Sequence, residues 1–90
     1  MSYKYKLKFI PIALKEWGKL DNSVKEQFKK KLSERLNDPC VASSRLHGFE
    51  NYYKIKLKSA GYRLVYEVIE NEMSVVVIAI NRRDKIYKKL

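Results

Sequence analysis

The chain has 90 residues and a formal net charge of +10 at pH 7, because 20 Lys and Arg outnumber 10 Asp and Glu. This length allows one small domain, and we expect residues 1–90 to form a single unit. With 46% hydrophobic residues the chain can bury a core, which excludes a disordered basic tail. No apolar run approaches the roughly 18 residues of a membrane span, and the opening residues lack a signal-peptide core. We therefore expect a cytoplasmic protein with no membrane partner.

The sequence contains one cysteine, Cys40, and one histidine, His47. A single cysteine cannot form a disulfide within the chain, and the pair falls short of the three or four ligands of a zinc site. We expect neither a metal nor another cofactor. Any chemistry must therefore rely on Lys, Arg, Tyr or a carboxylate.

The first forty residues predict a strand followed by two helices. Residues 3–9 alternate apolar and basic side chains, as a half-buried strand does. Pro11 suits the first turn of a helix, and apolar residues follow at helical spacing. The sequence 23–26 has the form of a capping box that starts a second helix, and Pro39 ends it. The residues expected to face the core are Ala13, Leu14, Trp17 and Leu20 in the first helix and Val24, Phe28, Leu32 and Leu36 in the second.

Three strands are predicted in the second half of the chain, at 53–57, 62–68 and 75–80, joined by short turns at 59–61 and 70–72. Short connections make antiparallel neighbours, and the unbroken apolar run of the last strand is typical of a strand inside a sheet. The predicted fold is α+β: an N-terminal strand, a helical hairpin, then a three-stranded antiparallel meander that completes the sheet. Residues 81–90 form a short basic helix or tail.

The strand 53–57 and the strand that follows it carry the clearest candidate site. Lys54, Lys56 and Lys58 lie on one face of the first strand, about 6.8 Å apart. Arg63 lies on the same face if its neighbours Tyr62 and Leu64 pair with the core side of that strand. No carboxylate occurs from position 52 to position 66, so this positive charge is not neutralised locally. The alternative interpretation is a solvated strand face whose lysines prevent edge-to-edge aggregation.

Two further basic segments are candidates for contact with nucleic acid. Arg82, Arg83 and Tyr87 follow the last strand, and a tyrosine beside an arginine can stack on a base while the guanidinium holds a phosphate. The alternative is a frayed, solvated chain end. Lys29 and Lys30 on the second helix are candidate RNA contacts, with a solvated helix face as the alternative.

The order of elements and several segments resemble the RelE toxin family, within the RelE and ParE superfamily. The resemblance extends from the first strand to Tyr87, and its most specific motif is Gly61-Tyr62-Arg63-Leu64-Val65-Tyr66. A short Leu-x-Gly segment is shared with gyrase-inhibiting ParE relatives. The other matching segments are Ala13 to Trp17, Arg45-Leu46-His47-Gly48, Tyr53-Lys54-Ile55-Lys56-Leu57 and Arg83 to Tyr87.

The resemblance implies the toxin of a type II toxin–antitoxin system. Such a toxin is a ribosome-dependent endoribonuclease that enters the A site, beside 16S rRNA, and cleaves mRNA by attack of a ribose 2′-OH. A cognate antitoxin protein neutralises it.

The same resemblance implies a catalytic set. Lys54 and Lys56 would help to activate the 2′-OH, Arg63 would stabilise charge on the phosphate, Arg83 would protonate the leaving 5′-oxygen, and Tyr87 would orient the substrate. From their charge and position, and not from the resemblance, Lys58 and Arg82, with the two helix lysines, are expected to bind RNA. Since the basic end is short, Arg82 is an alternative to Arg83 in the leaving-group role.

The residue types themselves favour dependence on the ribosome. Lysine and arginine can hold phosphate and stabilise a transition state, but they are poor general bases near neutral pH. Such a site therefore needs another structure to align the 2′-OH with the phosphate. Two other functions fit the same scaffold: a gyrase-inhibiting ParE-like toxin, and a non-catalytic RNA-binding domain.

Overall fold

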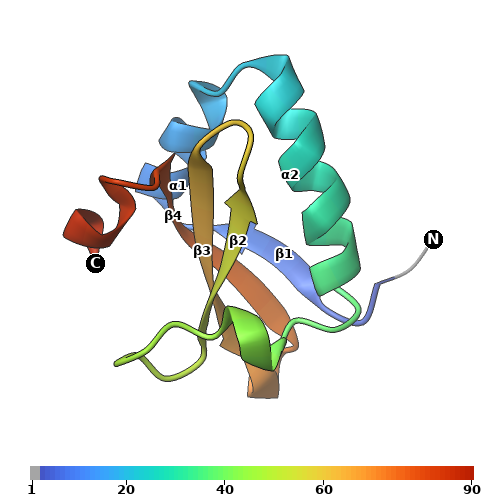
Figure 1. Ribbon diagram of the computed structural model, residues 1–90. Helices are drawn as coiled ribbons and strands as arrows, with labels where there is room; N and C mark the ends of the chain where they lie inside the picture. Colours follow the sequence, from blue (N-terminus) through green and yellow to red (C-terminus); the bar gives the residue numbers. More distant parts are fainter. Residues whose placement is uncertain (1–2) are drawn as a thin grey trace.

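The computed structural model describes residues 3–90, so the first two residues of the predicted unit 1–90 lie outside the described residues. The predicted α+β architecture is confirmed (Figure 1). None of the helices in residues 3–90 is long and apolar enough to cross a membrane. The regular elements are β1 (Lys6–Phe9), α1 (Pro11–Gly18), α2 (Asn22–Arg35), β2 (Tyr52–Leu57), β3 (Tyr62–Ile69) and β4 (Ser74–Arg82).

The four strands form one mixed sheet in the order β1-β4-β3-β2. The antiparallel meander of β2, β3 and β4 is confirmed, and β4 is an interior strand as its apolar run predicts. The sequence did not indicate that β1 would lie parallel to β4, with Lys6 opposite Ser74 and Phe9 opposite Val77. β1 and β2 are therefore the two edges of the sheet.

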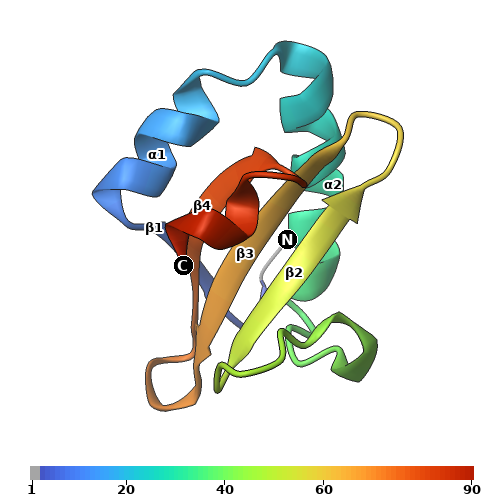
Figure 2. The ribbon, with the colours of Figure 1, turned by 60° about the vertical axis from the view of Figure 1, so that its left-hand side comes forward.

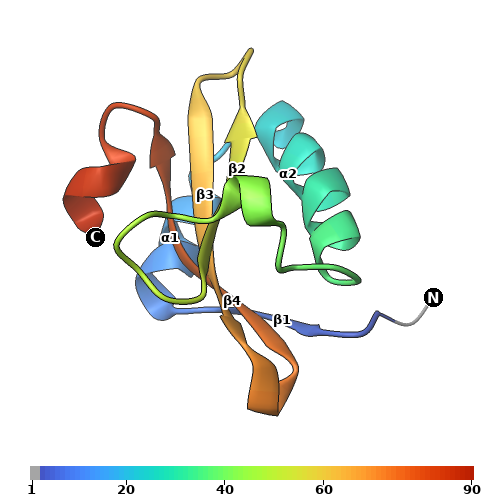
Figure 3. The same ribbon diagram turned by 60° about the horizontal axis from the view of Figure 1, so that its bottom comes forward.

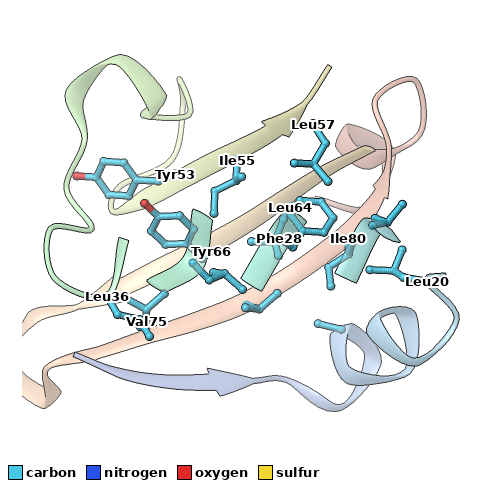
Figure 4. Close-up of a cluster of buried hydrophobic side chains, with 14 of the residues drawn as sticks. Leu20, Phe28, Leu36, Tyr53, Ile55, Leu57, Leu64, Tyr66, Val75 and Ile80 are labelled. Carbon is cyan, nitrogen blue, oxygen red and sulfur yellow. The ribbon is translucent and has the colours of Figure 1, made fainter. Parts of the chain in front are cut away.

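Both helices cover one face of the sheet, and the main core lies between them and the strands (Figures 2 and 4). The four-residue spacing on α2 is confirmed, because its apolar residues are buried. On α1, Ala13 is buried, but Leu14 is 55% exposed and the prediction that it faces the core is wrong. Leu14 follows Ala13 by about 100° around the helix, which turns it away from the sheet. Labelled core residues in Figure 4 include Phe28, Ile55, Leu57, Leu64, Tyr66 and Ile80.

The first strand is shorter than the predicted 3–9, and the residues just before it bond to the end of α2. The backbone N–H of Tyr5 donates to the carbonyl of Leu36, and that of Lys4 donates to Oδ1 of Asn37. These acceptors lie at the end of α2, so residues 4 and 5 are held against that end of the helix. Pairing begins at Lys6.

The start of α2 differs from the predicted capping box. Asp21 is the N-cap residue, with an extended backbone, and its Oδ1 accepts a hydrogen bond of 2.9 Å from the N–H of Val24. Ser23 lies inside the first turn, and Glu26 contacts Lys29 instead of reaching back. An aspartate one position before the helix satisfies the free N–H group of Val24, whereas the predicted box would have served those of Ser23 and Glu26.

Tyr66 of β3 ties the end of α2 to the sheet. Its side chain is buried, its hydroxyl donates to the carbonyl of Pro39 at 2.7 Å, and it accepts from Nη1 of Arg35 at 2.9 Å. Burial raises the pKa of the Tyr66 hydroxyl, which favours the protonated donor form. Arg35 also donates to the backbone carbonyl of Lys54 and to the hydroxyl of Ser44. One side-chain network thus fixes α2, β2 and the loop after α2.

Replacing Tyr66 by Phe should lower the free energy of unfolding by about 1–3 kcal/mol, because the Pro39 carbonyl and the Arg35 guanidinium lose a buried partner. Urea denaturation followed by circular dichroism measures the change. Tyr3→Phe, at a position 44% exposed, is the matched control and should shift stability by less than about 0.5 kcal/mol. Equal midpoints for the two variants would contradict the role given to this network.

Candidate functional site

The face of the sheet away from the helices gathers the cations predicted from the second strand pair. Arg63 on β3 lies directly opposite Lys56 on β2, and Lys54 lies opposite Val65. The residues between them, such as Ile55 and Leu64, pair on the other face, in the main core. The predicted register is therefore confirmed, and Lys56 and Arg63 have Cβ atoms about 5 Å apart. Two like charges that face each other across a strand pair destabilise the fold. The pairing of Lys56 with Arg63 must therefore be explained by function and not by stability.

A tight turn brings the end of β4 to the same place. Gly61 has a φ of 70°, a left-handed conformation that suits glycine, and its carbonyl accepts the N–H of Arg83 at 3.0 Å. A hollow of about 220 Å³ opens here. We call it the cationic hollow, defined by the four cations that line it: Lys56, Lys58, Arg63 and Arg83.

Arg82 and Arg83 leave β4 on different sides. Arg82 is opposite Tyr62 in the ladder, and its guanidinium carbon lies 5.5 Å from the centroid of that ring, which packs against the main core. Arg82 therefore lies on the helix side of the sheet and does not line the cationic hollow. Glu16 of α1 steadies this end of β4, because its Oε1 accepts the backbone N–H of Ile80 at 3.0 Å. Of the two arginines, Arg83 alone lines the hollow.

The basic end is anchored by one apolar residue. Ile86, in a short 3-10 turn at Ile86–Lys89, is fully buried on the open face of the sheet, where it belongs to a second apolar cluster. A frayed chain end does not describe this segment. The next residue, Tyr87, is 43% exposed, and its hydroxyl accepts a 2.6 Å hydrogen bond from Nη1 of Arg63. The second apolar cluster consists of Leu46, Val65, Ala79 and Ile86.

A second hollow lies beside Lys54, and the sequence did not indicate it. The loop before β2 runs on the same side of the sheet as the C-terminal turn (Figure 3). It encloses about 620 Å³ between residues 42–50 and Lys54. We call this space the loop hollow. In the sequence, the aromatic residues Phe49 and Tyr52, just before the lysine-bearing strand, were the signal that could have indicated this hollow.

The helix lysines proposed as RNA contacts lie elsewhere. Lys29 and Lys30 are exposed on α2, which covers the opposite face of the sheet, and Lys29 pairs with Glu26 at 3.3 Å. They do not line the cationic hollow. Contact between these lysines and RNA remains a prediction that concerns a separate surface.

Among residues 3–90, the cations of the site have no acidic partner in an ion pair. The ion pairs within residues 3–90 are Lys8 with Glu72 and Lys29 with Glu26, and neither involves the cationic hollow. No group of three or more His, Cys, Asp or Glu in the described part of the chain could hold a metal ion. Unpaired guanidinium and ammonium groups around one hollow suit a phosphate, because guanidinium can bind its oxygens in pairs.

The chain is similar to known toxins of type II toxin–antitoxin systems. The family of ParE toxins of type II toxin–antitoxin systems matches residues 7–87. The chain is 49% identical over 81 residues to the mRNA interferase toxin RelE of Escherichia coli strain K12, which covers 90% of this chain and 85% of the relative.

Solved structures agree with the sequence comparison. The isolated E. coli RelE toxin superposes with a TM-score of 0.85 at 50% identity, covering 87% of this chain and 83% of that one. The toxin in the intact E. coli RelBE toxin–antitoxin complex also gives a TM-score of 0.85 at 50% identity, with coverage of 87% and 95%.

Proposed function

The chain belongs to the family of type II toxins that includes ParE and RelE, and we propose that it is an mRNA interferase. It cleaves mRNA in the ribosomal A site, next to 16S rRNA, and so stops translation. The observation that carries this proposal is the cationic hollow, where Lys56, Arg63 and Arg83 meet without a carboxylate. A phosphodiester is the group that such a hollow binds best.

The reaction requires a proton to leave the ribose 2′-OH and another to reach the departing 5′-oxygen. The 2′-oxygen bonds to the adjacent phosphorus, which gives a cyclic phosphate and a free 5′-OH. In the proposed arrangement Lys54 and Lys56, which share one face of β2, lie beside the attacking ribose, and the free amine of one of them takes the 2′-OH proton. Arg63 holds the charged phosphate oxygens, and Arg83 lies at the end of β4 where it can supply the leaving-group proton.

Tyr87 has two roles in this arrangement. Its hydroxyl accepts the hydrogen bond from Arg63, which fixes the direction of the guanidinium before RNA binds. Its ring is partly exposed and can stack on a base. Lys58 also lines this hollow, where it adds attraction for the RNA backbone.

The groups in the cationic hollow explain why the ribosome is needed. The hollow contains neither histidine nor a carboxylate, so it lacks the usual acid–base pair of a free-standing ribonuclease. Its cations can bind a phosphate and stabilise the negative charge of the transition state. The ribosome supplies what is missing, by holding the mRNA so that the 2′-OH is in line with the phosphate.

The biological setting follows from the family. The RelBE complex is the precedent for a protein antitoxin that binds and neutralises this chain. We place the protein in the cytoplasm, where its mRNA and ribosomes are. A gyrase-inhibiting role is the alternative within the family. The identity of 49% to an mRNA interferase and the cationic hollow both favour RNA cleavage.

Arg63→Ala should slow cleavage of A-site mRNA by about 10²–10³-fold, the usual effect of losing one group that stabilises a transition-state oxyanion. Primer extension on programmed ribosomes measures the rate. Lys15→Ala removes an exposed charge from α1 and serves as the control, with a rate close to that of the unaltered chain. Cleavage by folded Arg63→Ala at the normal rate would show that the catalytic set is wrongly assigned.

The neighbouring arginines offer a matched pair. Arg83→Ala should lower the maximal cleavage rate by about 10²-fold, because it removes the group proposed to protonate the leaving oxygen. Arg82→Ala should change the maximal rate at most a few-fold, because Arg82 lies over Tyr62 on the other face. Single-turnover cleavage at saturating toxin compares the two variants. A larger rate loss in Arg82→Ala would reverse their roles.

A further inference from the structure

The loop hollow has the features of a binding site for one nucleotide, beginning with a prebuilt aromatic stack. The rings of Phe49 and Tyr52 lie parallel, with centroids 5.1 Å apart and planes 8° apart. Tyr52 packs against the second apolar cluster, so it supports Phe49 from behind. Phe49 is nevertheless 39% exposed and lines the hollow. A flat apolar ring with an open side is a platform on which a nucleobase stacks.

The loop that carries this platform is fixed at both ends. The N–H of Leu46 donates to the carbonyl of Tyr52 at 2.8 Å, and the carbonyl of Asn51 accepts the N–H of Val68 on β3 at 2.9 Å. Gly48 adopts a φ of 84°, which lets the chain turn between these ties. The platform is therefore held in place before any ligand arrives, which lowers the entropic cost of binding.

The charges around the hollow suit a nucleotide whose base enters and whose phosphate stays outside. Arg45 and Lys54 line it and can hold phosphate oxygens, whereas the carboxylate of Glu50 repels them. The same carboxylate can accept a hydrogen bond from the exocyclic amino group of a base. The volume of about 620 Å³ lies within the roughly 300–1,000 Å³ of pockets that bind small molecules.

The position of the loop hollow connects it to the cleavage site. Lys54 lines the loop hollow, and Lys56, two residues further along β2 on the same face, lines the cationic hollow. The two lysines are about 6.8 Å apart along the strand. An RNA strand that follows β2 therefore passes directly from one hollow to the other.

From these observations we propose that the loop hollow holds the base of an mRNA nucleotide next to the scissile phosphate, stacked on Phe49. This inference rests on the proposed function as an mRNA interferase. Phe49 is a positioning residue, because it holds a neighbouring nucleotide and does not touch the reacting atoms. It fixes the register of the mRNA over Lys56 and Arg63.

The test uses ribosomes programmed with an mRNA whose A-site riboses are 2′-O-methylated, which removes the nucleophile and prevents cleavage. The fluorescent base 2-aminopurine replaces each A-site base in turn, and stacking quenches its emission. Toxin binding is titrated for Phe49→Ala, Phe49→Leu and Phe49→Trp. Leu14→Ala, which removes an exposed apolar side chain from α1, is the control. Cleavage of unmodified mRNA is measured in parallel for every variant.

The unaltered chain, Phe49→Trp and Leu14→Ala should quench 2-aminopurine strongly at the position that stacks on Phe49, as well as at any base that stacks on Tyr87. Phe49→Ala and Phe49→Leu should lose the quenching at the Phe49 position and bind about five- to 100-fold more weakly, which is the effect of one lost base–aromatic stack. Phe49→Leu keeps an apolar side chain but no ring, so it separates stacking from loop packing. Equal quenching and affinity in all variants would overturn the inference, as would a Phe49→Trp protein as weak as Phe49→Ala. If the unaltered chain cleaves no mRNA on ribosomes, it is the proposed function that fails.

Discussion

The antiparallel register between β2 and β3 is the constraint on which the site depends. It places Lys56 opposite Arg63 on one face and Ile55 opposite Leu64 on the other. A slip of one residue would exchange the faces, burying cations in the core and exposing the apolar side chains. The free energy of burying the core therefore maintains an arrangement of like charges that is itself unfavourable.

The open face of the sheet is organised by a small apolar cluster of its own. Leu46 comes from the loop before β2, and Ile86 comes from the chain end; both are buried against Val65 and Ala79. Two segments far apart in sequence are thus held on the same surface. The loop also carries Phe49, stacked on Tyr52, and the chain end carries Tyr87, which binds Arg63. The sheet, the loop before β2 and the chain end together form a surface that can contact several consecutive nucleotides of an RNA strand.

Much of this could be predicted from the sequence because the relevant signals are local. Alternation gave the β2–β3 pairing and the shared face of its cations, and four-residue spacing gave the buried face of α2. The parallel pairing of β1 could not be predicted, since it depends on where the helical hairpin returns the chain. The start of α2 was misassigned because Asp21 and Ser23 are both good caps, and only the backbone conformation distinguishes them.

The site was predicted less completely, because its geometry depends on contacts between residues that are far apart in the sequence. Whether Arg82 or Arg83 reaches the hollow depends on which side each leaves β4, and this follows from the pairing of Arg82 with Tyr62. Ile86 is buried in a cluster with Leu46 and Val65, which are distant from it in sequence. The loop hollow arises where residues 42–50 fold back toward Lys54. The spacing of residues along the chain does not predict this contact.

The central claim is that the cationic hollow cleaves RNA only when another structure aligns the substrate. Cleavage mapping of one mRNA with the unaltered chain, in the presence and absence of ribosomes, tests this claim most directly. We expect cuts within the A-site codon on ribosomes, and free RNA that binds in a salt-sensitive way but stays intact. Cleavage of free RNA at a comparable rate would contradict it.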